Sequence, residues 1–142
     1  MFTLLALLTA DAPDVPVETL AEKAQASFGA DRGFRVEFET LPFKKDRSII
    51  LRWPGWTARL FPETGAKVAD DTTGIARILG DMAPPELSTA SRRVRAVFYD
   101  DPQEEYTDQM VELTRLLREL PGALVFDPRA TTSSTSMAHA PS

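Results

Sequence analysis

The feature that most constrains the fold is an uninterrupted apolar segment, Phe2–Leu8, near the start of the chain. It is far shorter than the roughly 18 apolar residues of a membrane-spanning helix. A short apolar run bounded by Thr9 and the proline-containing segment 11–16 is typical of a strand buried on both faces. The alternative is a cleaved signal, since Ala10-Asp11-Ala12 has the small-residue spacing of a cleavage site. No basic residue precedes the run, which favours the strand.

Apolar periodicity predicts three helices in the rest of the chain. The first covers 17–28, between Pro16 and Gly29; the second carries Ile75 to Met82, with Asp70, Asp71 or Thr72 as its N-cap. The third begins with a capping box at 101–104 and continues to Leu120, with Leu113 and Leu117 at the centre of its apolar stripe. Further strands are predicted at 34–38, 49–53, 56–61, 93–99 and 123–126.

The resulting order is β-α-β-β-β-α-β-α-β. It predicts an α+β domain with a single mixed sheet and helices packed mainly on one side. A ferredoxin-like core with an added unit satisfies this order. We expect one domain over 1–128, followed by a disordered polar tail over 129–142, where small polar residues offer too little apolar surface to order the chain.

Composition narrows the chemistry. The chain of 142 residues has no cysteine, and its one histidine, His139, lies in the polar tail. Thiolate metal sites, thiol nucleophiles and histidine triads are therefore excluded, and we expect no catalytic residue, metal site or cofactor. A net charge of -5 disfavours nucleic acid and anionic membranes as partners and favours a basic protein. Arginine outnumbers lysine, which is typical of a GC-rich bacterial genome, and we expect a cytoplasmic protein.

The predicted third helix carries a line of acids spaced four residues apart: Glu104, Asp108 and Glu112. Like charges at this spacing each cost roughly 0.2–0.5 kcal/mol in an isolated helix. Val111 lies beside the line, away from the predicted core, so these four residues are the candidate partner-binding site. The alternative is a solvated face that Arg115 and Arg118 partly neutralise.

Trp53-Pro54-Gly55-Trp56 gives a second candidate surface. Two tryptophans that flank a turn can form a platform for a ligand or a partner, although core packing is the commoner role of such rings. Arginines also stand at outward positions of the predicted strands, and Glu37 and Glu39 on one of these strands favour cross-strand ion pairs over a basic binding face.

Residues 53–65, from Trp-Pro-Gly-Trp to Phe-Pro-Glu-Thr-Gly, and residues 98–128, from Phe-Tyr-Asp-Asp-Pro to Val-Phe-Asp-Pro, resemble small bacterial α+β proteins, some of which look like immunity proteins of secreted toxins. The resemblance implies a non-enzymatic interaction domain that binds and masks a toxin or effector, and it carries over no catalytic residue. Two alternatives stay open. One is a homo-oligomeric structural or small-ligand-binding domain that uses the sheet face and the tryptophan turn. The other is an enzyme that relies on arginine and carboxylate alone.

Overall fold

The computed structural model describes residues 1–40 and 47–128, so the predicted tail lies outside the described residues. Its main elements follow the predicted order: β1 (Phe2–Leu8), α1 (Val17–Phe28), β2 (Arg35–Thr40), β3 (Arg47–Trp53), β4 (Trp56–Thr64), α2 (Ala66–Leu79), β5 (Arg92–Phe98), α3 (Thr107–Arg118) and β6 (Ala123–Phe126). Two short 3-10 helices, η1 (Gly80–Met82) and η2 (Pro85–Thr89), join α2 to β5.

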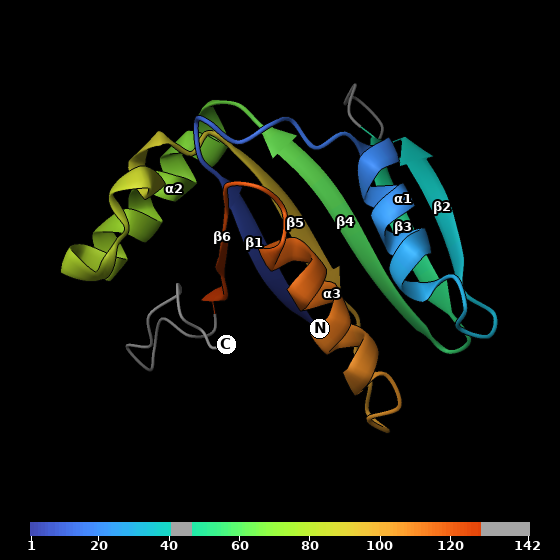
Figure 1. The fold of residues 1–142 in the computed structure, drawn as a ribbon. Coiled ribbons are helices and arrows are strands. Elements are labelled where there is room, and N and C mark those ends of the chain that lie inside the picture. Colours follow the sequence, from blue (N-terminus) through green and yellow to red (C-terminus); the bar gives the residue numbers. More distant parts are fainter. Residues whose placement is uncertain (41–46, 129–142) are drawn as a thin grey trace.

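The strands form one sheet in the order β2-β3-β4-β5-β1-β6 (Figure 1). The α+β class and the single sheet are confirmed. Each of the five pairings between described strands is antiparallel, so the sheet is antiparallel where a mixed one was expected. The difference arises because β1, the first strand of the chain, is inserted between β5 and β6 and runs opposite to both.

Part of this arrangement matches the expected ferredoxin-like core. The elements β1, α1, β4, β5, α3 and β6 follow one another as β-α-β-β-α-β, and their strands lie in the order β6-β1-β5-β4. The additions are a β2–β3 extension at the β4 side of the sheet and the helical segment α2-η1-η2 between β4 and β5.

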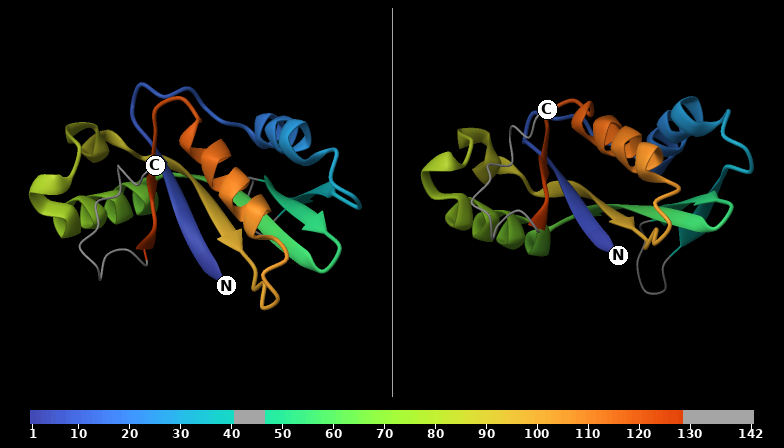
Figure 2. Two further views of the ribbon diagram at one scale, coloured as in Figure 1. Left: turned by 60° about the horizontal axis from the view of Figure 1, so that its bottom comes forward. Right: turned by 90° about the horizontal axis from the view of Figure 1, so that it is seen from below.

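Helices α1 and α3 cover the same face of the sheet, side by side (Figure 2). Alternate residues of each inner strand point into this face, as expected for strands with a period of two. Its fully buried members include Ala6, Ile49, Leu51, Ala58, Leu60, Val94, Ala96 and Phe98 from the strands and Leu20, Ala24, Leu113 and Leu117 from the helices. The predicted role of Leu113 and Leu117 as core anchors is therefore confirmed.

The opposite face of the sheet is covered over only part of its width. Helix α2 and η2 pack there on the intervening residues of β1 and on β6, forming a smaller core of Leu5, Leu7, Ile75, Leu87, Ala90 and Phe126. Over β2, β3 and β4 the same face carries charged side chains instead. In the described part of the chain, no helix has both the length and the apolar character that crossing a membrane requires.

The predicted start of α2 is wrong. The helix begins at Ala66, after Gly65, so Asp70, Asp71 and Thr72 lie inside it and cap nothing. The Thr72 hydroxyl donates to the Val68 carbonyl within the helix. The Asp71 carboxylate accepts a hydrogen bond from Arg93 of β5 at 3.1 Å, so the acid that resembled a cap attaches the helix to the sheet.

Candidate protein-interaction surface

Helix α3 begins at Thr107, later than the capping box predicted. Both oxygens of the Asp101 carboxylate accept backbone N–H groups, from Glu105 at 3.1 Å and from Tyr106 at 2.8 Å. These bonds close a tight turn in which Glu104 has a φ of 53°, a conformation that non-glycine residues seldom adopt. Glu104 therefore lies off the helix, and only Asp108 and Glu112 of the predicted line of acids are helical neighbours.

Asp108 and Glu112 line a groove between α3 and the end of α1. The groove has a volume of about 380 Å³ and is lined by Ser27, Phe28, Asp31, Asp108, Gln109 and Glu112. We call these six residues the acidic groove. It gathers three carboxylates from two segments of the chain, beside the buried Phe28 at the end of α1.

Asp31 is the residue of this groove that the sequence did not single out. One oxygen of its carboxylate accepts the indole N–H of Trp53 at 2.9 Å and the amide N–H of Gln109 at 3.3 Å. Both bonds hold the carboxylate in place between α1 and α3, which reduces the side-chain entropy lost when a partner binds it. Asp31 lies 77 positions before Asp108 in the printed sequence, so only the tertiary structure shows that they are neighbours.

The other two carboxylates differ in how far they are already neutralised. Glu112 forms an ion pair with Arg115, which also contacts Glu119 at 2.9 Å. Hydrogen bonding to Glu112 and the charges of both acids raise the pKa of the Arg115 guanidinium above its usual value. Asp108 has no ion pair or hydrogen bond with any other side chain that the structure describes. It is therefore the carboxylate most available to a partner.

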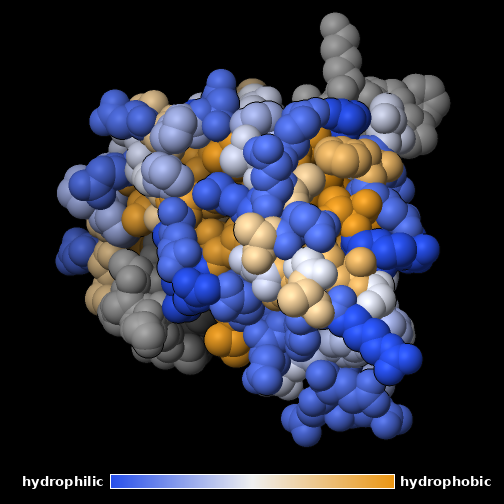
Figure 3. Space-filling view, turned by 45° about the vertical axis from the view of Figure 1, so that its right-hand side comes forward, coloured by the Kyte–Doolittle hydropathy of each residue, from blue (hydrophilic) through white to orange (hydrophobic). Residues whose placement is uncertain are grey.

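The predicted exposure of Val111 is confirmed. It is 65% exposed on the outer face of α3, one helical turn from Asp108. Hydrophilic side chains with apolar areas between them cover the side of the molecule seen in Figure 3. An exposed valine beside acids is the kind of mixed surface that a protein partner covers on binding.

The tryptophan turn is built differently from an exposed platform. Trp53 is 5% exposed and Trp56 is 3% exposed, and their ring centroids lie 5.0 Å apart. Trp53 also packs on Phe28 and Trp56 stacks on Tyr106 at 5.3 Å, so both rings belong to the core beneath the helices. The indole N–H of Trp56 donates to the Tyr99 carbonyl at 2.8 Å, as a buried indole requires.

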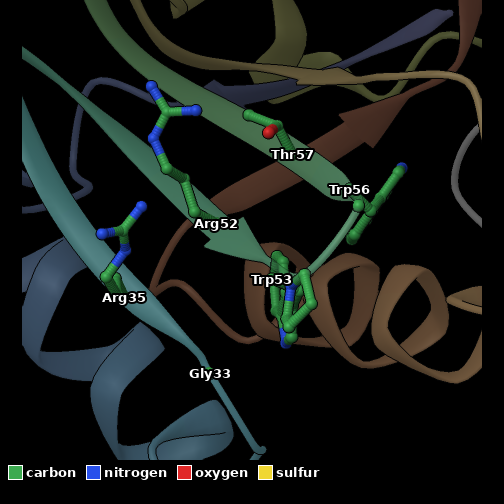
Figure 4. A pocket seen from close by; sticks show the side chains of 8 residues that line it. Gly33, Arg35, Arg52, Trp53, Trp56 and Thr57 are labelled. Atoms are coloured by element: carbon green, nitrogen blue, oxygen red, sulfur yellow. The ribbon is translucent and has the colours of Figure 1, made fainter.

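A shallow hollow of about 510 Å³ remains beside this turn. Figure 4 shows Arg35, Arg52 and Thr57 on three neighbouring strands, β2, β3 and β4, while Trp53 points the other way, toward α3. Arg52 forms an ion pair with Glu37 at 2.9 Å, and Arg35 lies 3.5 Å from the same carboxylate. The arginines of the hollow are thus already paired, which makes it a weaker candidate than the acidic groove.

The open half of the sheet carries the cross-strand ion pairs expected from the sequence. We call it the charged face; it comprises Arg35, Glu37, Glu39, Arg52, Arg59, Glu63, Arg93 and Arg95. Burial alone would raise the pKa of Glu63, but hydrogen bonds from Arg93 at 2.8 Å and Arg95 at 2.9 Å, with their charges, outweigh it and hold the pKa below its usual value. Arg59 and Arg95 lie over the Phe61 ring, at 5.2 Å and 4.2 Å.

Within residues 1–40 and 47–128, no group of three or more histidine, aspartate or glutamate side chains is arranged to hold a metal ion. Comparison of the chain with protein-family models, with curated proteins and with solved structures finds no match. The case for a function therefore depends on the surfaces described above.

Proposed function

We propose that this protein is a non-enzymatic protein-interaction domain, an immunity-type inhibitor that binds and masks a basic bacterial toxin or effector in the cytoplasm. The observation that carries the proposal is the acidic groove. It gathers Asp31, Asp108 and Glu112 from two segments of the chain, next to the exposed apolar side chain of Val111.

The groove suits a lysine or arginine side chain of a partner. A cationic side chain that enters between α1 and α3 meets the oriented Asp31 carboxylate and the unpaired Asp108. The groove therefore offers two carboxylates, one of them held in a fixed orientation, to one anchoring residue.

Acids in the turn before α3 extend the negative potential around the groove. Glu104 and Glu105 are exposed there, close in sequence to Asp108, and the net charge of the whole chain is -5. A potential of one sign steers a partner of the opposite sign and raises the association rate at low ionic strength. Inhibitors that must capture a toxin quickly benefit from this effect.

The test uses the partner isolated from the native host and the Asp108→Lys variant. Asp108 has no ion pair or side-chain hydrogen bond within the described residues, but it lies in the first turn of α3, where the helix dipole favours an acid, so the variant should stay folded and lose only about 0.3–1 kcal/mol of stability. At about 0.01 M ionic strength, where the Debye length is about 30 Å, we expect association to slow by about tenfold. At about 1 M the Debye length is about 3 Å, and the two rates should converge.

Glu86→Lys is the matched control, because it changes the net charge equally at an exposed position of η2, away from the groove. Its association rate should stay within about twofold of the wild type at both salt concentrations. Equal rates for Asp108→Lys and Glu86→Lys at low salt would remove the groove from the interface.

A further inference from the structure

Strand β2 forms one edge of the sheet. It pairs with β3 alone, so the backbone groups on its outer side lack a strand partner within the described residues. With six residues it is longer than β6, the four-residue strand at the other edge. An unpaired edge of this length is a template for a further strand.

The side chains of β2 distinguish it from a protected edge. Proteins block edge pairing with prolines, bulges or charges, lysine above all. Strand β2 contains no proline or lysine, and it carries charges of both signs, Arg35, Glu37 and Glu39, on the charged face, with Val36 and Phe38 on the helix-covered face. Phe38 is 49% exposed, a large apolar surface for an edge strand.

We propose that β2 pairs antiparallel with β2 of a second copy of this chain, about a two-fold axis that passes through Val36. In this register Arg35 faces Glu37 of the second copy, and the symmetry repeats the pair. On the other side of the sheet Phe34 faces Phe38 of the second copy. The dimer would then contain one continuous sheet of twelve strands, twice the six of each copy.

Repulsion between facing acidic side chains disfavours the neighbouring registers relative to this one. A two-fold axis at Glu37 would place Glu37 opposite its own copy, and an axis at Phe38 would place Glu37 opposite Glu39. Directly opposed like charges destabilise a strand pair, whereas opposite charges and aromatic pairs stabilise it. Among these even registers, which keep the helices of both copies on the same side, the one centred on Val36 places no like charges opposite each other: Arg35 faces Glu37, and Glu39 faces Gly33.

The residues that would meet are already positioned. Arg52 holds the Glu37 carboxylate at 2.9 Å, and the Arg35 side chain remains 67% exposed. Phe34 packs on Trp53 with ring centroids 4.8 Å apart, so it forms a fixed apolar surface for Phe38 of the second copy. Pairing would thus cover the exposed Phe38 ring and add an arginine of the second copy to the two that already lie beside Glu37.

The helices leave room for this pairing. Helix α1 lies over β3, one strand in from the edge. With strands about 4.8 Å apart, the β3 strands of the two copies would be about 14 Å apart. Packed helices need only about 8–10 Å between their axes, so two α1 helices fit without collision. The acidic groove is lined by residues of α3 and of the end of α1, and α1 lies between α3 and β2 (Figure 1), so we expect the dimer to leave the groove open.

The test measures oligomeric state by sedimentation equilibrium. We expect wild type to be a dimer with micromolar affinity. Arg35→Glu makes both facing side chains of each pair acidic, and Glu37→Arg makes both basic, so each single variant alone should dimerise at least about tenfold more weakly. Mixed together, the two variants present opposite charges at both facing positions, and they should form a heterodimer with near wild-type affinity.

Arg77→Glu on α2 and Glu86→Arg on η2 are the matched controls, because both are exposed and remote from β2. They should dimerise like the wild type, alone and when mixed. Thermal melts of the four variants establish that each is folded, and Arg35→Glu tests the edge by itself if Glu37→Arg does not fold. A wild type that remains monomeric up to about 1 mM overturns the proposal. So does a dimer that Arg35→Glu leaves unchanged.

Discussion

The two faces of strands β3, β4 and β5 are formed by alternating residues of the same segments, yet one face is an apolar core and the other carries charged side chains. In β3, Ile49 and Leu51 are fully buried beneath α1, while Arg52 points to the other side and pairs with Glu37. The helix-covered face is a close-packed apolar core with an aromatic cluster around Trp53. The charged face is an array of ion pairs that water reaches from one side.

The contrast shows that the number of contacts is a poor guide to stability. Burying a large apolar side chain contributes about 1.5–3 kcal/mol, whereas an exposed ion pair contributes about 0–1 kcal/mol. The charged face makes many specific contacts, and we expect only the most enclosed of them, around Glu63 and Arg93, to contribute strongly to stability. Predictions that perturb one face at a time can break or refine this distinction.

The largest effect is expected on the helix-covered face. Leu113 and Leu117 of α3 are each 0% exposed. Replacing either with alanine should lower the free energy of unfolding by about 2–5 kcal/mol, through lost burial and the cavity left behind. Denaturant unfolding of the two single variants measures this directly. A loss below about 0.5 kcal/mol would contradict the packing of α3 on the sheet.

An intermediate effect is expected where the charged face is most enclosed. Glu63 accepts hydrogen bonds from Arg93 and Arg95, and Arg93 is only 7% exposed. Glu63→Gln should cost about 1–3 kcal/mol at neutral pH, since the buried Arg93 then keeps only Asp71 as an anionic partner and Arg95 loses the carboxylate that it contacts.

The stability that Glu63 contributes should also depend on pH, and it should decrease in acid. The pKa of Glu63 is lowered in the folded state, so its contribution is complete above the usual glutamate pKa of about 4.3 and is lost as the pH falls through the folded-state pKa. The stability difference between wild type and Glu63→Gln should therefore shrink in acid. A difference that is constant from neutral to acid pH would show that the carboxylate charge is not what stabilises this region.

Much of the fold was predictable because the pattern is local. The run Phe2–Leu8 became a central strand, and α1 has the predicted bounds, Val17–Phe28, because apolar spacing and the flanking Pro16 and Gly29 agree. The start of α2 was missed because Gly65 caps it without a side-chain hydrogen bond. The acids inside α2 resembled a cap in sequence, while Asp71 was in fact directed to a strand by tertiary contacts.

The candidate site was only partly predictable for the same physical reason. Asp108, Glu112 and Val111 share a helix, so their spacing placed them together correctly. Glu104 was assigned to that helix because Asp101-Pro102 matches a capping box, but the carboxylate of Asp101 closes a turn instead and displaces Glu104. Asp31 joins the groove through a hydrogen bond to Trp53, a contact between segments that no local pattern encodes.

The smallest effect is expected at the exposed rim of the charged face, at Arg52, which directly follows the buried Leu51 in β3. Arg52 forms an ion pair with Glu37 at 2.9 Å, but their side chains are 40% and 39% exposed. Arg52→Gln should change the free energy of unfolding by less than about 1 kcal/mol, because water and salt screen the pair, and the change should approach zero in about 1 M salt.

The adjacent Leu51 is fully buried, and its replacement by alanine should lower the free energy of unfolding by about 2–5 kcal/mol. Thermal melts of both variants in dilute protein, where β2 edges do not associate, compare the two faces at neighbouring positions of one strand. A loss for Arg52→Gln that approached that of Leu51→Ala would show that the charged face stabilises the fold as strongly as the core does.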